Sequence, residues 1–278
     1  MLYPTWERGL FTSGGLIEMT DDASSDAGQG AEGAARLPLF YKSFAPLDPK
    51  RHGKLRLKRK GDYSFARQSS IVPLLCIEFG LAQKHYPIIF TRNAPHLPMA
   101  LVSYQQDSNP LVQAGGGWTP GRYLPAYLRR YPFALVPTSR ESNRLALCID
   151  EQSGLFEEGA EGLFFDGDQP SEKTQEILAF CREFDRQLTL TQAFSARLAE
   201  LDLLEETRIR MRHGENSRDL QGFMAVSEKK LNALSDEQLL SLRPNGYLPV
   251  IYAHLMSLAG EQSVASQSKG VAQLAQDA

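Results

Sequence analysis

The spacing of apolar residues changes along the chain, and this change is the strongest constraint on its fold. Before residue 150 the apolar residues occur in short strand-like runs, as in 99–104, 133–136 and 144–150. After Ser171 they recur every three or four residues, which is the spacing of one helix face. A chain whose strands precede its helices forms an α+β domain rather than a doubly wound sheet. We therefore predict an α+β fold, with a mixed or antiparallel sheet in the N-terminal and central part and a helical C-terminal half.

Local patterns predict the individual elements. We expect a helix over 71–84, a strand over 85–90 and a short helix over 123–130. Ser171 and Thr191 are each expected to cap a helix. The other expected elements are strands over 203–211 and 220–226, a helix opened by the capping-box pair Ser235 and Gln238, and a last helix over 247–258.

Both ends of the chain differ in composition from its centre. Residues 12–35 consist largely of Gly, Ala, Ser, Thr and acids, without the periodic apolar face that offsets the entropy of ordering. We expect disordered tails over 1–36 and 260–278 on either side of one domain over 37–259. The Gly14-Gly15 codons before Met19 are compatible with a ribosome-binding sequence, so Met1 and Met19 both stay open as the native start.

Composition narrows the class of protein. The formal net charge is -3, which argues against a protein that mainly coats nucleic acid. We find no basic and apolar leader of a signal peptide, and no apolar run approaches the ~20 residues of a membrane span. The three cysteines, Cys76, Cys148 and Cys181, are far apart and lie in apolar runs, which is typical of buried reduced thiols. We expect a soluble, cytoplasmic protein.

A dense basic segment lies early in the predicted domain. Leu55 and Leu57 alternate with basic residues, so they predict a strand whose outer face is a solvated basic surface. The alternative is a patch for an acidic partner, a membrane or a nucleic acid. This patch is the one hint of nucleic-acid binding, which we otherwise disfavour. Its residues are Lys50, Arg51, Lys54, Arg56, Lys58, Arg59 and Lys60.

Several short blocks together resemble the SapC family of proteobacterial proteins. The resemblance runs from about Leu37 to Leu258 and implies a link to cell-surface or nutrient-uptake systems, because the family takes its name from surface-array gene clusters. Members also occur beside genes for outer-membrane uptake and for flavin-dependent halogenase-like enzymes. The resemblance implies no catalytic residue and no cofactor. The blocks include Leu39-Phe-Tyr-Lys42, His85-Tyr-Pro-Ile-Ile-Phe90, Gly121-Arg-Tyr-Leu-Pro-Ala-Tyr-Leu-Arg-Arg-Tyr-Pro-Phe133 and Gly246-Tyr-Leu-Pro-Val-Ile-Tyr252.

Positive and negative charges are segregated in the middle of the chain. Between Asp107 and Glu141 there are arginines but no acids, and between Arg144 and Lys173 there are acids but no basic residues. One interpretation is that the arginines pair with the acidic segment and pin it in place. The other is that arginines and rings after the flexible triple glycine 115–117 recognise a protein partner or a small anionic or polar ligand. The binding candidates are Trp118, Arg122, Tyr123, Tyr127, Arg129, Arg130 and Tyr131.

An enzyme is the alternative to a binding or accessory protein. His213, Glu215 and His254 have the spacing of a facial triad, so a metal-dependent oxygenase, or an accessory subunit of an oxygenase or halogenase-type enzyme, is the second hypothesis. A core histidine is the commoner role for His254, and we expect no metal and no cofactor. The sequence contains no G-x-S-x-G, C-x-x-C, H-E-x-x-H or phosphate-binding loop motif.

Overall fold

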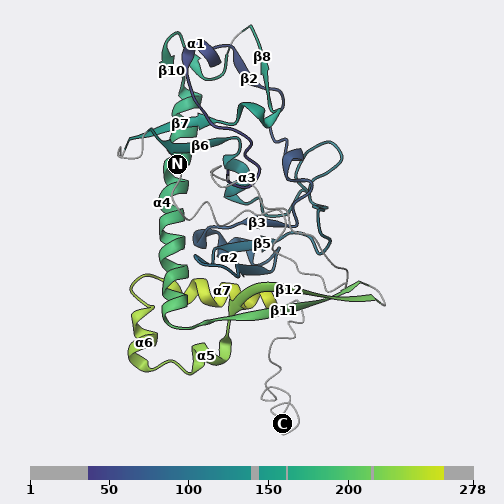
Figure 1. Ribbon diagram of the computed structural model, residues 1–278, viewed down its shortest axis with the longest axis vertical. Helices are drawn as coiled ribbons and strands as arrows, with labels where there is room; N and C mark the ends of the chain where they lie inside the picture. Colours follow the sequence, from purple (N-terminus) through teal and green to yellow (C-terminus); the bar gives the residue numbers. More distant parts are fainter. Residues whose placement is uncertain (1–36, 139–143, 161, 214–215, 260–278) are drawn as a thin grey trace, which may run out of the picture.

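Two antiparallel sheets and one long helix organise the chain (Figure 1). The computed structural model describes residues 37–138, 144–160, 162–213 and 216–259. Every strand pairing among these residues is antiparallel. The predicted α+β class is therefore confirmed. Of the two sheet types that we expected, mixed or antiparallel, the structure has the antiparallel one.

The larger sheet has five strands in the order β11-β12-β4-β5-β3. Its centre is apolar on both faces, since all four residues of β4 and of β5 are buried. A long hairpin joins the sheet only where Phe223 and Met224 pair with Thr91 and Phe90, so its tip projects from the body (Figure 1). The strands are β3 (Ile71–Pro73), β4 (Ile88–Thr91), β5 (Pro98–Leu101), β11 (Leu204–His213) and β12 (Asn216–Val226).

The smaller sheet brings distant parts of the chain together. It has the order β1-β7-β6, and the early residue Ala45 pairs with Ile149. Two short two-stranded units, β2-β8 and β9-β10, lie at the same end of the molecule (Figure 1). The strands are β1 (Ala45–Pro46), β6 (Phe133–Pro137), β7 (Leu145–Ile149), β2 (Leu55–Leu57), β8 (Phe156–Glu158), β9 (Phe165–Asp166) and β10 (Gln169–Pro170).

Helix α4 (Glu172–Glu200) runs along one side of both sheets (Figure 1). Its 29 residues span about 43 Å at 1.5 Å per residue. Ser171 caps it as predicted, because its side chain accepts from the Thr174 N–H. The predicted second helix starting at Thr191 is wrong. The Thr191 hydroxyl instead donates to the Gln187 carbonyl at 2.8 Å and accepts from the Cys76 N–H at 2.9 Å. Because these bonds satisfy the hydroxyl, Thr191 lies inside α4 and does not cap a new helix.

The helix predicted over 71–84 is also only partly correct. Residues 71–73 form the edge strand β3, paired with β5, and an edge strand tolerates Pro73 because that position needs no donor. Helical structure begins later, as η2 (Cys76–Glu78) followed by α2 (Phe79–Ala82). Strand pairing with a segment 28 residues away has overridden the local helical pattern.

Short helices complete the structure at the C-terminal end and near the sheets. Ser235 and Gln238 form the predicted capping box at the start of α6 (Asp236–Ser241). The last helix, α7 (Tyr247–Ala259), packs beside α2. Within the described ranges, no helix combines the length and apolarity of a bilayer span. The other helices are α1 (Pro49–His52), η1 (Ser64–Ala66), α3 (Ala126–Arg130), η3 (Glu151–Ser153) and α5 (Glu228–Asn232).

Candidate functional site

The seven binding candidates divide into a buried group and an accessible group. Tyr127, Arg130 and Tyr131 are only 4–6% exposed, so they belong to the core around α3. Arg122 and Arg129 are exposed, while Trp118 and Tyr123 are half-buried. The structure therefore brings four of the candidates to the surface and uses three to build the platform under them.

Arg130 is a buried cation enclosed by aromatic rings. Its guanidinium carbon lies 4.2 Å from the Phe184 ring centroid and 5.1 Å from that of Tyr127. A guanidinium nitrogen is 3.7 Å from an Asp185 carboxylate oxygen on α4. Burial raises the pKa of Asp185 to about 6, and Arg130 opposes that rise. Arg130 thus fastens α3 to α4 rather than meeting solvent.

The accessible arginines lie beside aromatic rings. The Arg129 guanidinium carbon is 5.4 Å from the Phe180 ring centroid, and its charge acts on Tyr63 and Tyr123 to oppose the rise in their pKa that burial causes. The Trp118 ring stands edge-on to Tyr63, with centroids 6.1 Å apart. The charge of Arg122 acts on His85. Burial is the main cause that lowers the pKa of His85, and Arg122 lowers it further. Cationic and aromatic groups thus lie together at this surface.

The buried carboxylate of Glu78 anchors this surface. It is 3% exposed, and its two oxygens accept from the Tyr123 hydroxyl at 2.8 Å, the Ala126 N–H at 2.7 Å and the Leu75 N–H at 2.8 Å. Burial raises the pKa of Glu78, while these hydrogen bonds and Arg129 oppose the rise. Sequence reasoning missed Glu78 because Tyr123 and Ala126 are 45 and 48 residues away and Glu78 fell inside the expected helix.

Asp150 is a second buried carboxylate that was not predicted as a site residue. It is fully buried and accepts from the Tyr131 hydroxyl at 3.0 Å and from the N–H groups of Lys42, Ser43 and Gln152. The Ser43 hydroxyl also donates to it, at 2.9 Å. Asp150 therefore ties the start of the domain to α3 and to the end of β7.

The triple glycine forms a hydrogen-bonded turn rather than the flexible loop expected. The Gly116 N–H donates to Gln113 at 2.8 Å, and the Gly116 carbonyl accepts from the Tyr63 N–H at 2.7 Å. Gly116 has φ +84°, and a Cβ there would lie 2.5 Å from an Asp62 carboxylate oxygen. Glycine is required at this position for close approach, not for opening and closing.

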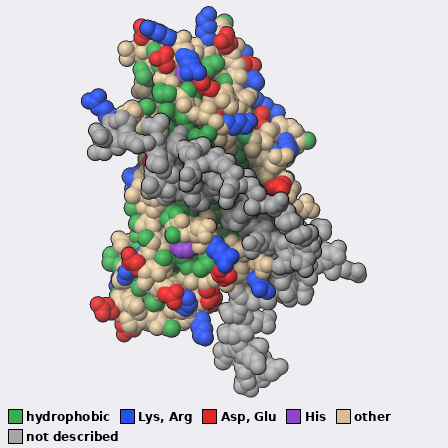
Figure 2. Space-filling view, viewed as in Figure 1, with side chains coloured by type: hydrophobic (Ala, Val, Ile, Leu, Met, Phe, Trp, Pro, Cys, Tyr) green, Lys and Arg blue, Asp and Glu red, His purple; other side chains and the backbone are tan. Residues whose placement is uncertain are grey.

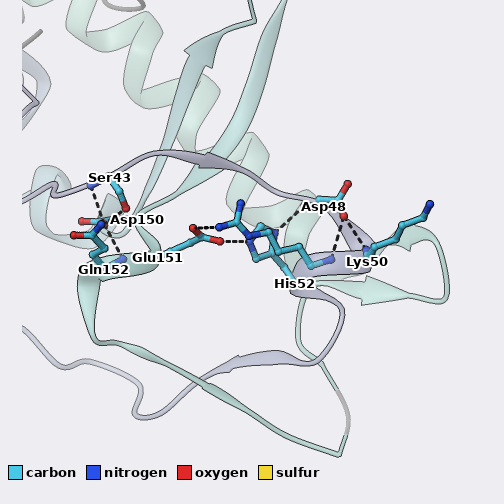
Figure 3. Close-up of polar contacts among 8 residues, drawn as sticks. Ser43, Asp48, Lys50, His52, Asp150, Glu151 and Gln152 are labelled. Carbon is cyan, nitrogen blue, oxygen red and sulfur yellow. Dashed lines mark hydrogen bonds and ion pairs between the residues drawn. The ribbon is translucent and has the colours of Figure 1, made fainter. Parts of the chain in front are cut away.

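The acidic segment pairs with the early basic segment. Figure 2 shows both charge types mixed at the end of the molecule that carries α1, β2 and β8. Arg51 and His52 both contact the Glu151 carboxylate, at 2.7 and 2.8 Å (Figure 3). Arg56 pairs with Glu157 across β2 and β8, and Lys58 donates to the Gly154 carbonyl. Two of the acids in the clamp interpretation, Glu151 and Glu157, are thus held by ion pairs whose cations come from the early basic segment.

The metal candidates do not lie together. His254 is fully buried on α7, and its Nε2 accepts from the Val226 N–H at 3.0 Å, so that nitrogen is not available to a metal. His213 is at the far end of β11, nine residues from the Leu204–Val226 pair, which is about 30 Å along a strand. Glu215 lies outside the described residues. Among the residues that the structure does describe, no group of three or more His, Cys, Asp or Glu could hold a metal ion.

The cysteines lack the environment of a nucleophile. All three are free, and burial raises the pKa of Cys76 and Cys181 to about 12 and that of Cys148 to about 11. A thiol with such a pKa stays protonated and unreactive at neutral pH.

Comparison with known families identifies the family of the chain. The model of the SapC family matches residues 47–263, which is well over half of the chain. The chain belongs to the SapC family. Searches of curated proteins and of solved structures give no significant match. The match gives the family and assigns no role to any residue.

Proposed function

We propose that this SapC-family chain is a binding or accessory protein that recognises a carboxylate- or phosphate-bearing ligand or partner at Arg122 and Arg129. The observation that carries the proposal is the exposed guanidinium of Arg129 beside the half-buried ring of Tyr123, with the exposed Arg122 next to Tyr123 in the chain. Guanidinium groups bind planar anions through paired hydrogen bonds, and adjacent rings stack on apolar or sugar faces. The platform is rigid because Glu78 and Arg130 are hydrogen-bonded or stacked beneath it.

The rest of the charge distribution supports a ligand site at the arginine surface. Much of the basic segment is engaged with Glu151, Glu157 and backbone carbonyls, which supports a ligand at the arginine surface over nucleic acid at 50–60. The family's surface-array name makes a component of a cell-surface or nutrient-uptake system the partner class that we propose. Free, buried cysteines support a cytoplasmic location.

The test uses one aromatic anion and its uncharged counterpart. Phenyl phosphate carries both groups that the surface would recognise, whereas phenol lacks the phosphate. Binding is followed by Trp118 fluorescence in a Trp6→Phe background. We expect phenyl phosphate to bind, and Arg122→Ala and Arg129→Ala each to weaken it about tenfold, the effect of one charged hydrogen bond.

The matched control is Arg92→Ala, because Arg92 is also exposed and pairs with Glu206 elsewhere on the surface. It should bind like the parent protein, and all three variants should melt within a few degrees of it. Equal binding of phenol and phenyl phosphate, or unchanged binding in both arginine variants, would contradict the proposal.

A further inference from the structure

The exposed surface of η2, α2 and α7 contains no charged side chain. The two groups that carry or gain charge in these helices, Glu78 and His254, are 3% and 0% exposed. Large apolar side chains occupy the exposed positions instead, and Figure 2 shows hydrophobic atoms gathered over α2 and α7. We call this surface the apolar patch. It consists of Ile77, Leu81, Leu190, Tyr252 and Met256, which are 48–65% exposed.

Contacts between the helices join these residues into one surface. The Cys76 N–H donates to the Thr191 hydroxyl, which holds η2, with Ile77, against the part of α4 that carries Leu190. Tyr247, at the start of α7, meets the Phe194 ring of α4 edge to face, with ring centroids 5.2 Å apart. Both α2 and α7 thus begin at α4 and lead to β4, where the Ile88 N–H donates to Ser257. The two helices pack against each other.

We propose that the apolar patch is a symmetric interface with a second copy of this chain. In a twofold contact each patch meets itself, so the parts of the patch on η2, α2 and α7, which expose no charged side chain, meet no like charge. Each of the five side chains exposes half to two-thirds of its surface, which is on the order of 100 Å². Two patches in contact therefore bury about 1,000 Å² in total. Specific interfaces begin at about that area. A membrane surface fits less well, because lipid-binding helices carry Lys or Arg beside their apolar face and α7 has neither.

The inference is independent of the proposed arginine site and is tested on the full chain. Sedimentation over a hundredfold range of concentration should show a dimer. Met256→Glu and Leu81→Glu should each raise the dimer dissociation constant at least about a hundredfold, because each buries two unpaired charges. The control is Leu145→Glu: Leu145 is 51% exposed but lies on β7, so the dimer should persist. Circular dichroism confirms that each variant is folded.

A charge-pair rescue shows that patch meets patch. Mixing the Met256→Glu and Met256→Lys proteins should restore a dimer that neither forms alone. A parent protein that is monomeric throughout, or a dimer untouched by both glutamate variants, would overturn the proposal. Flotation of a monomeric parent with phosphatidylcholine vesicles, lost in Met256→Glu, would assign the patch to a lipid surface instead.

Discussion

The guanidinium carbon of Arg130 lies 4.2 Å from the centroid of the Phe184 ring on α4. Arg122, eight residues earlier in the same arginine-rich segment, is exposed. Two arginines that the sequence presents as equivalent therefore have different roles, and they should respond differently to substitution.

Arg130→Ala should lower the free energy of unfolding by about 3 kcal/mol, because it removes a buried cation and leaves Asp185 facing a cavity. Arg122→Ala should change it by less than about 0.5 kcal/mol. Urea denaturation of both variants measures the difference. Equal and small effects would mean that Arg130 does not hold α3 to α4.

Asp185 should make stability depend on pH. Its folded pKa, about 6, is above the unfolded value of 3.8, so the folded state binds the proton more tightly. The stabilising contribution is therefore complete below pH 4 and is lost as pH rises through 6. Asp185→Asn should remove this fall, which we expect to be about 1 kcal/mol after allowing for the partial exposure of the side chain. Parallel stability profiles of the parent and variant between pH 4 and 7 would contradict this role.

Glu78→Gln tests the anchor beneath the arginine surface. The amide can keep the oxygen that Tyr123 and Ala126 share, but its NH₂ then faces the Leu75 N–H. Two opposed donors should cost about 1–3 kcal/mol of unfolding free energy. Near-ultraviolet circular dichroism should also change, because Tyr123 loses part of its constraint. A stability equal to the parent would show that Glu78 is not the anchor.

Deletion of the N-terminus tests where the domain begins. Removal of residues 1–36 should leave the melting temperature unchanged, because residues 12–35 offer no apolar face. Removal of 1–46 should abolish cooperative unfolding. That deletion takes away Tyr41, whose hydroxyl donates to the Phe133 carbonyl, and the N–H groups of Lys42 and Ser43, which donate to Asp150. Two deletions with the same melting temperature would place the boundary at 47, where the family match starts.

Local patterns predicted elements well where the deciding interaction is also local. Ser171 and the Ser235–Gln238 pair act within three residues of themselves, and both start helices as expected. Thr191 and the segment 71–73 were misjudged because their partners, Cys76 and β5, come from other parts of the fold. The site was predicted only in part for the same reason. Arg129 is exposed and Arg130 is buried, although they are neighbours on one helix. Their difference in exposure depends on the elements that pack against that helix, and the local sequence does not reveal those elements.

The pairing of β1 with β7, β2 with β8 and β4 with β12 has a consequence for synthesis on the ribosome. Each of these early strands pairs with a strand that is synthesised roughly 100 or more residues later. Ala45 pairs with Ile149, and Phe90 pairs with Met224. A nascent chain that ends before β12 cannot close the larger sheet. The N-terminal half thus emerges with unpaired apolar strands, and we expect it to depend on chaperones until translation is almost complete.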